Sequence, residues 1–330
     1  MIISRTPLRI SLGGGGTDLY QWYSKYESFF ISAAINKYIY VTLNERSLKK
    51  DFWISYSKIE NFKEKKFIKH SIISEILKKK KFKNGLEIHS ISEVPSGSGL
   101  GSSGALTVGL IKNIIEYEKN NLTKQQVAEM AVDIEMKLNK KNAGKQDQFI
   151  STYGGIKCFK INKKGQTLNK IIKIPNDNLI NLKENLFIVY TDEKRDAEKI
   201  IKKQSNIINK FKNKNYLMSE IQKIGYETYE VFKSKNMSSF GELLDRHWSI
   251  KKKFGDFMTS CKIDDDYENF KQNGASGGKI IGAGGGGFFM LYAKQKNKLE
   301  KFLKDNNYRM LNWDFDYEGS KILLNSFKKK

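Results

Sequence analysis

The sequence has little proline or cysteine and no long hydrophobic run. Three prolines and no low-complexity segment in 330 residues leave no marked linker between domains. Cys158 and Cys261 lie far apart without CxxC or Cys/His spacing, which argues against a disulfide scaffold or a zinc site. The longest apolar stretches fall well short of the ~20 residues that span a bilayer, and the N-terminus lacks the apolar core of a signal peptide. We therefore expect a globular, cytoplasmic protein.

Negative charge is also scarce. The chain has 59 Lys and Arg against 36 Asp and Glu, a formal net charge of +23. Such an excess is typical of proteins that bind nucleic acid or anionic membranes. Here the lysines are scattered over many segments, such as FKEKKFIKH and LKKKKFKNG, and do not form one stripe. We interpret them as solvated surface that could also attract anionic substrates, and we expect neither nucleic acid nor a membrane as a partner.

A change of pattern divides the chain into two predicted domains, 1–181 and 182–330. The first mixes strands, at Tyr38–Arg46 and Leu86–Val94, with helices, one of which begins at Thr123 with the capping box TKQQ. The second contains a strand from about Asn185, helices at Ala197–Lys212, Tyr216–Lys235 and Ser239–Phe254, the strand FFMLYA, a helix at Lys296–Asp305 and a β-rich tail from Tyr308. SFGE at Ser239 predicts a second capping box.

Glycine, by contrast, is concentrated in three stretches. These are SLGGGGTDL at Ser11–Leu19, PSGSGLGSS at Pro95–Ser103 and IGAGGGGFF at Ile281–Phe289. Glycine is used where φ must be positive or where another group must approach the backbone closely. Each stretch alone could be a plain turn, but three of them in one chain favour a role in binding.

The middle stretch has the features of a phosphate site. It follows a predicted strand and leads into a helix with Leu106, Leu110 and Ile114 at helical spacing, so its N–H groups would converge at a helix N-terminus, where an anion is favoured. It is not a Walker A loop, because no GK[ST] follows, and GxGxxG is not matched. The third stretch matches GxGxxG formally, but it precedes a strand where that fingerprint must precede a helix.

Two carboxylates follow the capped helix start. Glu135 lies at the edge of the apolar face of that helix, and Asp147 lies in AGKQDQF just beyond it. On the residues alone, Glu135 could be a boundary carboxylate that points to solvent, and Asp147 could be an N-cap. Both could equally serve phosphoryl transfer, which needs a metal ligand and a group that orients the acceptor hydroxyl.

PSGSGLGSS resembles the phosphate-binding motif of the GHMP kinases, the family of galactokinase, homoserine kinase and mevalonate kinase. The other two stretches fall where that family has its first and third motifs, and the resemblance spans nearly the whole chain. It implies an α+β fold, with an N-terminal domain like the second domain of ribosomal protein S5 and a ferredoxin-like C-terminal domain, and ATP and Mg²⁺ between them. The residues that it implies for ATP are Pro95, Ser96, Gly97, Ser98, Gly99, Leu100, Gly101, Ser102 and Ser103.

The resemblance also implies catalytic roles. Glu135 would bind Mg²⁺ together with Ser103. Asp147 would be the general base, and Arg9, which matches the basic residue of the first motif, would keep Asp147 ionised. The homoserine kinases are similar and lack such a base, so transfer without a full base stays open.

The first motif carries the substrate information. Galactokinases have Glu and His where this chain has Gly15 and Gly16, which disfavours a galactokinase. RTPLRISLGGGGTDLYQWY instead resembles the D-glycero-D-manno-heptose 7-phosphate kinases, although AGKQD replaces the double glycine usual in that subfamily. The implied reaction moves the γ-phosphoryl group of ATP to the anomeric C1 hydroxyl and gives the 1,7-bisphosphate for GDP-heptose. A kinase for fucose or a uronic acid, or a silent sugar-phosphate sensor, is the alternative.

The resemblance finally suggests how the substrate is held. Asp18 would accept hydrogen bonds from sugar hydroxyls, and the distal phosphate requires cations of its own, each of which could equally be an ordinary surface charge. The cation candidates are Lys145, Arg195 and the group Arg246, His247 and Lys251. The complete predicted substrate set is Gly15, Gly16, Thr17, Asp18, Lys145, Arg195, Gly285 and Gly286. A homodimer is a possible assembly.

Overall fold

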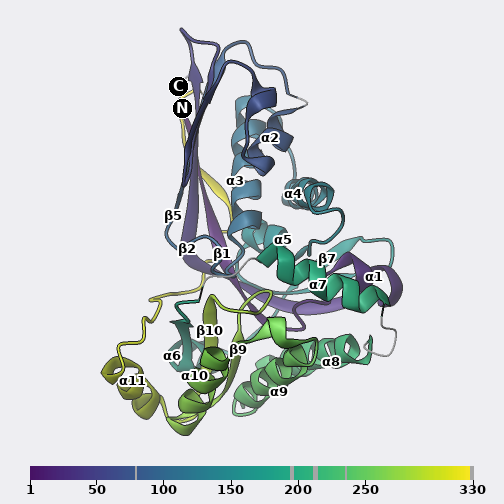
Figure 1. Cartoon of the computed structure of the whole chain (residues 1–330), viewed down its shortest axis with the longest axis vertical. Coiled ribbons are helices and arrows are strands. Elements are labelled where there is room, and N and C mark those ends of the chain that lie inside the picture. The colour runs from purple at the N-terminus through teal and green to yellow at the C-terminus, as the bar shows by residue number, and fades with distance from the viewer. Residues whose placement is uncertain (79, 194–196, 211–214, 235, 328–330) are drawn as a thin grey trace.

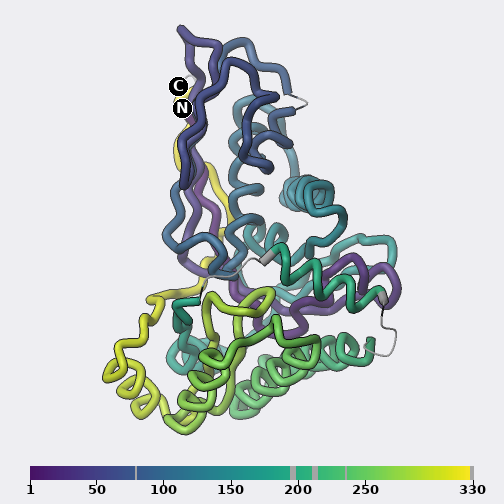
Figure 2. The backbone as a smooth tube through the Cα atoms, in the orientation of Figure 1, coloured from purple at the N-terminus to yellow at the C-terminus, as the bar shows by residue number. Residues whose placement is uncertain are grey.

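The computed structural model describes residues 1–78, 80–193, 197–210, 215–234 and 236–327. These residues form two β-sheets with helices packed against them, an α+β arrangement (Figure 1). Figure 2 shows that the tall first sheet and its helices stand on a second layered unit built mainly from the C-terminal half of the chain. None of the helices in these ranges is long and apolar enough to cross a membrane.

The first sheet has eight strands in the order β11-β1-β2-β5-β3-β4, with β6 paired to β2 and β7 paired to β6. Its strands are β1 (Ile2–Gly13), β2 (Ser28–Arg46), β3 (Phe52–Ser55), β4 (Ile59–Phe62), β5 (Gly85–Ser92), β6 (Ile156–Ile161), β7 (Thr167–Ile171) and β11 (Lys321–Asn325). Ile2 lies opposite Asn325 in the β1–β11 pair, so the two ends of the chain lie side by side (Figure 1).

Helix α3 (Ser102–Tyr117) packs along β1 and β2, because its apolar positions face the sheet. Leu106, Leu110 and Ile114 of this helix are buried in the main core. The other helices of this part are α1 (Tyr20–Tyr26), α2 (Ser71–Lys78), α4 (Lys124–Leu138) and α5 (Gln146–Tyr153), with a 3₁₀ turn at Lys65–Phe67. Helix α3 also packs against α4 and α5, and these contacts hold the three helices together in the layer that follows the second glycine stretch.

The second sheet is antiparallel, in the order β8-β10-β9. Its strands are β8 (Leu186–Tyr190), β9 (Ala275–Ile280) and β10 (Phe288–Ala293). All six residues of β10 are buried, as expected for a central strand covered on both faces. The helices of this half of the chain are α6 (Asn176–Asn185), α7 (Ala197–Lys210), α8 (Asn215–Lys233), α9 (Phe240–Lys252), α10 (Cys261–Gln272) and α11 (Lys296–Asp305), with a 3₁₀ turn at Asp256–Met258. Of these, α9 and α10 pack against β9 of the second sheet, whereas α8 packs against β1 and β2 of the first.

The tail after α11 differs most from the sequence prediction. Instead of a β-rich segment it contains isolated bridges at Met310, to Val189, and at Phe315, to Ile35, followed by β11. The tail thus passes from the second sheet to the first, and its last strand completes the edge of the first sheet beside β1. The division at residue 182 stays a prediction. The segment 182–330 contributes β11 to the first sheet and the three strands β8, β9 and β10 to the second.

The two predicted capping boxes have different outcomes. At Thr123 both reciprocal hydrogen bonds with Gln126 are present, so this prediction is confirmed. At Ser239 the prediction is wrong, because this residue has helical backbone angles, φ −81° and ψ −5°, and its side chain makes no cap hydrogen bond. A capping N-cap residue has non-helical backbone angles, typically extended, from which its side chain accepts from the N–H groups of the first turn.

This difference gives a paired stability test. We expect Thr123→Ala to lower the free energy of unfolding by about 1 kcal/mol, because the Gln126 N–H group loses the Thr123 hydroxyl that accepts its hydrogen bond. Ser239→Ala is the matched control, expected within about 0.5 kcal/mol of the unchanged protein. Urea unfolding followed by circular dichroism measures both, and equal losses in the two variants would contradict the assignment.

Candidate active site

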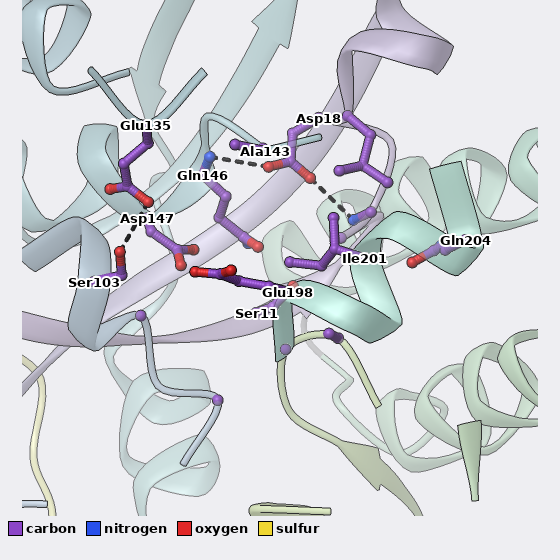
Figure 3. Close-up of a pocket in the computed structure, with 18 of the residues that line it drawn as sticks. Ser11, Asp18, Ser103, Glu135, Ala143, Gln146, Asp147, Glu198, Ile201 and Gln204 are labelled. Carbon is purple, nitrogen blue, oxygen red and sulfur yellow. Dashed lines mark hydrogen bonds between the residues drawn. The ribbon is translucent and has the colours of Figure 1, made fainter. Parts of the chain in front are cut away.

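A cavity of about 520 Å³ is lined by segments that lie far apart in the sequence (Figure 3). Residues of the first two glycine stretches and of the turn between α4 and α5 line one side. Helix α7, the residues Lys251 and Lys279 and the start of the third glycine stretch, at Gly282 and Ala283, line the other. The tertiary structure therefore brings all three glycine stretches to one cavity, which is the main candidate for the functional site.

The second glycine stretch forms a loop that ends at the N-terminus of α3. Gly97, Gly99 and Gly101 have φ of 75°, 85° and 82°, a conformation that residues with a Cβ rarely adopt. Gly101 is the N-cap residue and provides no side-chain cap, so this helix end is suited to an anion. The predicted ATP-binding residues that line the cavity are Gly97, Gly99, Gly101, Ser102 and Ser103. Those outside the lining are Pro95, Ser96, Ser98 and Leu100.

Arg9 and Asp147 form an ion pair in the wall of this cavity. Arg9 Nε lies 2.7 Å from Asp147 Oδ1, and the Arg9 guanidinium also donates to the carbonyl of Gly99. Asp147 is not an N-cap, a position that Lys145 occupies, but it lies in the first turn of α5, where the helix dipole favours a negative charge. The pair places a carboxylate beside the second glycine stretch, Pro95–Ser103, which we call the phosphate loop. There the carboxylate could accept a proton from a bound hydroxyl.

The position of Asp147 depends on Gly104 in α3. A Cβ on Gly104 would lie 2.6 Å from Asp147 Cβ, so Gly104→Ala must displace the carboxylate. We expect a loss of kcat of roughly 10²-fold, the effect of a displacement of about 1 Å. Gly109→Ala, in the same helix, would meet Thr6 instead and is the matched control, expected to cost stability with kcat nearly unchanged. Steady-state kinetics and thermal unfolding of both variants separate the two effects.

Glu135 points into the cavity and not to solvent. Ser103 Oγ donates to Glu135 Oε2 at 3.0 Å, and Gln148 Nε2 donates to Oε1 at 2.8 Å (Figure 3). Glu135 is 7% exposed, and burial raises its pKa to about 7, with the nearby charge of Asp147 acting in the same direction. A buried carboxylate and a hydroxyl on the phosphate loop suit Mg²⁺, which binds one or two carboxylates and takes its other ligands from phosphates and water.

Asp18 of the first glycine stretch is held by backbone donors. Its Oδ2 accepts from Lys145 N at 2.9 Å and Gln146 N at 3.0 Å, and its Oδ1 accepts from Gly16 N at 3.1 Å. Asp18 thus caps α5 from a distant part of the sequence and fixes the helix that carries Asp147 (Figure 3). Burial raises the pKa of Asp18, while the hydrogen bonds from Gln146 N and Gly16 N act against that rise. Asp18 still lines the cavity, next to Gly15 and Gly16.

Two family models match the parts of the chain that build this cavity. The model of the GHMP kinases N terminal domain matches residues 66–155, which include the phosphate loop, Glu135 and Asp147. The model of the GHMP kinases C terminal matches residues 228–310, which include α9 and the third glycine stretch. Together the matches take in just over half of the chain. The chain belongs to the GHMP kinase family.

Known GHMP kinases resemble this chain over nearly its full length. It is 27% identical to the D-glycero-alpha-D-manno-heptose 7-phosphate kinase of Campylobacter jejuni over 340 residues, covering 97% of this chain and 98% of that one. The structure of a D-glycero-D-manno-heptose 1-phosphate kinase from Bacteroides thetaiotaomicron, at 20% identity, shares the fold with a TM-score of 0.80 over 98% of this chain and 99% of that one. The mevalonate kinase of Methanococcus jannaschii, at 25% identity, has a TM-score of 0.71 over 95% and 98%.

These likenesses assign the fold and the class of enzyme. This α+β chain has the GHMP kinase fold, and the protein is a GHMP sugar kinase, a phosphotransferase that uses ATP. Relatives with different acceptors share the fold, so the fold alone does not select the substrate. The choice of acceptor must come from the side chains in the cavity.

The structure does not bring every predicted substrate residue of this GHMP kinase into the cavity. Lys145 Nζ donates to the carbonyl of Gly165 and lies 5.2 Å from the ring centroid of Tyr23, away from the lining. The hydroxyl of Thr17 is buried and donates to the carbonyl of Gly14 at 2.7 Å. Both side chains are therefore structural, because their polar atoms are satisfied within the protein. Arg195 lies outside the described residues.

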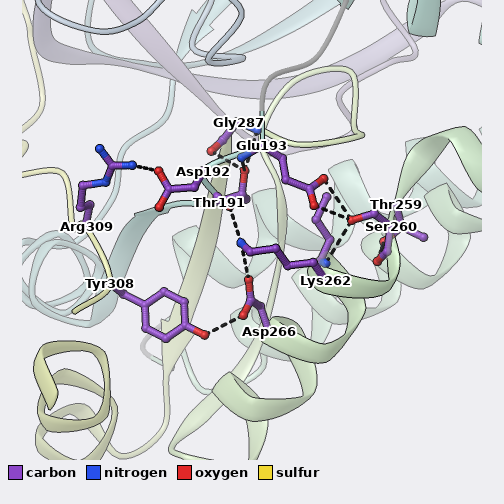
Figure 4. Close-up of polar contacts among 11 residues, drawn as sticks. Thr191, Asp192, Glu193, Thr259, Ser260, Lys262, Asp266, Gly287, Tyr308 and Arg309 are labelled. Carbon is purple, nitrogen blue, oxygen red and sulfur yellow. Dashed lines mark hydrogen bonds and ion pairs between the residues drawn. The ribbon is translucent and has the colours of Figure 1, made fainter. Parts of the chain in front are cut away.

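The end of the third glycine stretch is also structural. Gly285 N donates to the carbonyl of Met258 at 2.7 Å, and a Cβ on Gly286 would lie 2.8 Å from the carbonyl oxygen of Glu193. Gly287 N contacts Thr191 Oγ1 at 3.0 Å. Figure 4 shows the surrounding polar network, in which Thr191 and Glu193 connect this stretch to the start of α10. Gly285 and Gly286, which the sequence predicted as substrate residues, instead hold this loop in place through backbone contacts.

Sequence reasoning missed part of the cavity lining. Lys279 was not identified, although a lysine within the otherwise apolar and glycine-rich strand ASGGKI was a usable signal. Glu198, Ile201 and Gln204 lie three residues apart on one face of α7 and line the cavity (Figure 3). Nothing in the amphipathic pattern of α7 distinguishes these residues from an ordinary half-buried face.

Proposed function

We propose that this GHMP kinase transfers the γ-phosphoryl group of ATP to the anomeric C1 hydroxyl of D-glycero-D-manno-heptose 7-phosphate. The product would be the 1,7-bisphosphate, used for GDP-heptose. The observation that carries the proposal is the Arg9–Asp147 pair, which lies between the phosphate loop and the Asp18 side of the cavity. The similarity to the Campylobacter jejuni enzyme, which extends over 97% of the chain, supports this choice of acceptor.

In this proposal Asp147 accepts the proton of the C1 hydroxyl as the oxygen attacks the γ-phosphorus, and the bond between that phosphorus and the bridging oxygen breaks, so that ADP leaves. Arg9 Nε, 2.7 Å from Asp147 Oδ1, orients the carboxylate with a charge-assisted hydrogen bond, and the Arg9 guanidinium is held by the Gly99 carbonyl. The N-terminus of α3 binds the phosphates of ATP through backbone N–H groups. Catalysis then consists mainly of positioning and charge stabilisation, as phosphoryl transfer requires.

Glu135 and Ser103 are the proposed Mg²⁺ ligands. Their oxygen atoms lie 3.0 Å apart, so both can face one small cation. Gln148 fixes the orientation of Glu135 through the other carboxylate oxygen. Mg²⁺, when bound, would neutralise charge on the β- and γ-phosphates.

The test is ATP consumption with Mg²⁺ over a small panel of acceptors. The panel contains D-glycero-D-manno-heptose 7-phosphate, mannose 6-phosphate, sedoheptulose 7-phosphate, fucose and galactose. Turnover confined to the heptose phosphate is the expected result. Turnover of a free sugar would replace the acceptor and keep the kinase class, and ATP binding without any turnover would favour a sugar-phosphate sensor.

A further inference from the structure

Three residues that line the cavity carry a polar side-chain atom with no hydrogen-bond partner in the part of the chain that the structure describes. These atoms are Ser11 Oγ, Gln146 Nε2 and Gln204 Nε2. The residues are nearly fully buried, with exposed fractions of 3%, 5% and 3%. Buried polar groups are normally hydrogen-bonded, and an unpaired one destabilises the fold. Three of them at one cavity indicate that a bound molecule completes their hydrogen bonds.

The three side chains gather against the backbone of Gly15 and Gly16 in the first glycine stretch. A Cβ on Gly15 would lie 2.1 Å from Ser11 Oγ and 3.5 Å from Gln146 Oε1. A Cβ on Gly16 would lie 3.5 Å from Gln204 Nε2. Figure 3 shows Ser11, Gln146 and Gln204 at the same cavity. Because Gly15 and Gly16 lack a Cβ, residues from β1, α5 and α7 can approach this short piece of backbone.

The chemistry of these groups favours a ligand with several hydroxyl groups. The Nε2 atom of each glutamine carries two N–H donors, and the serine hydroxyl can both donate and accept. All three groups are neutral, whereas the strong hydrogen bonds that hold a phosphate have a charged donor such as Lys or Arg. The hydroxyl groups of a sugar accept from N–H donors and donate to a serine oxygen, so they match this set.

The unpaired groups lie on the side of the cavity where the proposed function places the acceptor. Gln146 directly precedes Asp147 in the first turn of α5, and its backbone N–H donates to Asp18 Oδ2 at 3.0 Å. Gly16 N donates to Asp18 Oδ1 at 3.1 Å. The two amides therefore neighbour residues that the proposed function assigns to the sugar.

We propose that Ser11, Gln146 and Gln204 bind hydroxyl groups of the acceptor sugar and contribute to its selection. Gln204 is the distinguishing member, because α7 lies outside the ranges 66–155 and 228–310 that the two family models match. The inference rests on the proposed function and deepens it, since it names side chains that distinguish one sugar from another. The ribose of ATP also carries hydroxyl groups, so the experiment must separate the two ligands.

Thermal unfolding is the first test. Gln204→Met and Gln146→Met keep the length of the side chain and remove the unpaired donor, so we expect the Tm to stay equal or to rise. Gln272→Met is the matched control, because Gln272 is exposed at the end of α10. A Tm of both variants well below that of the control would show that the two amides have partners within the protein, and would contradict the proposal.

Titration calorimetry then compares D-glycero-D-manno-heptose 7-phosphate, mannose 6-phosphate, fucose and galactose with a non-hydrolysable ATP analogue. We expect both variants to bind the preferred sugar of the unchanged protein about tenfold more weakly, because a hydroxyl group loses its donor inside a buried site. Affinity for the ATP analogue should stay within about twofold of the Gln272→Met control. The opposite result, weaker binding of the analogue with unchanged binding of the sugars, would assign the amides to the ribose and overturn the proposal.

The proposal is also overturned if both variants bind every sugar as tightly as the Gln272→Met control does. A failure of the proposed function has a different signature. The unchanged protein would then prefer fucose or galactose to the heptose phosphate, and the same comparison with that sugar would still decide whether the two glutamines bind it. An unchanged protein that binds none of the four sugars would contradict both proposals.

Discussion

Asp147→Asn is expected to lower kcat by about 10²- to 10⁴-fold, the contribution of a general base to proton transfer. Asparagine has the same shape, and its carbonyl oxygen can still accept from Arg9 Nε, which now lies 2.7 Å from Oδ1. The amide, however, cannot take a proton from the acceptor hydroxyl. The KM for ATP should change little, because the phosphate loop is untouched. Initial rates of ATP consumption over a range of both substrates measure the two parameters.

Asp133→Asn is the matched control for this prediction. Asp133 is exposed on α4, so this substitution removes the same charge outside the cavity. It should retain nearly full kcat. If Asp147→Asn also retained more than about a tenth of kcat, the loss would be too small for a general base. Arg9 and the phosphate loop would then carry the reaction by positioning and charge alone.

Glu135→Gln is the second large effect that we expect, a fall in ATP turnover of roughly 10²-fold or more, since the charge stabilisation given by a bound metal ion is worth several kcal/mol. The oxygen of the new amide can still accept from one of the two donors, Ser103 Oγ or Gln148 Nε2. Its N–H₂ group then faces the other donor and cannot accept from it. It also removes the negative charge from the proposed Mg²⁺ site. The Mg²⁺ concentration that gives half-maximal rate should therefore rise as the rate falls.

Glu129→Gln serves as the control in the same helix. Glu129 is exposed and accepts from Gln125 Nε2 at 2.7 Å, so its substitution changes the same charge without touching the cavity. We expect normal rates and a normal dependence on Mg²⁺ for this variant. An unaltered dependence on Mg²⁺ in Glu135→Gln would refute Glu135 as a metal ligand, whatever the effect on the rate.

Local signals account for what could be predicted from sequence. The glycine stretches, the helix that follows Ser103 and the capping box at Thr123 depend on residues close together in the chain, so their spacing is enough to identify them. Glu135 and Asp147 were selected by resemblance to the GHMP kinases. The structure brings both to the cavity with Arg9 and Ser103.

The direction of a side chain was the first thing that sequence could not decide. Lys145 and Lys279 are both lysines next to glycine-containing segments, yet Lys145 donates to Gly165 and Lys279 lines the cavity. Ser239 has the sequence of a cap but the backbone of a helix. In each case the outcome depends on neighbours and backbone angles that the short pattern does not contain.

The sequence, through its resemblance to the GHMP kinases, determined the class of chemistry: a phosphate loop before a helix, two carboxylates after it and a basic residue in the first motif. Only the tertiary structure decided which charges meet. Asp18 reaches the backbone of Gln146, and the last strand pairs with the first, through contacts between residues far apart in sequence. Lys279 becomes a cavity residue because β9 and α9 pack beside Arg9. Such long-range packing sets the burial, and burial sets the energy of each charge.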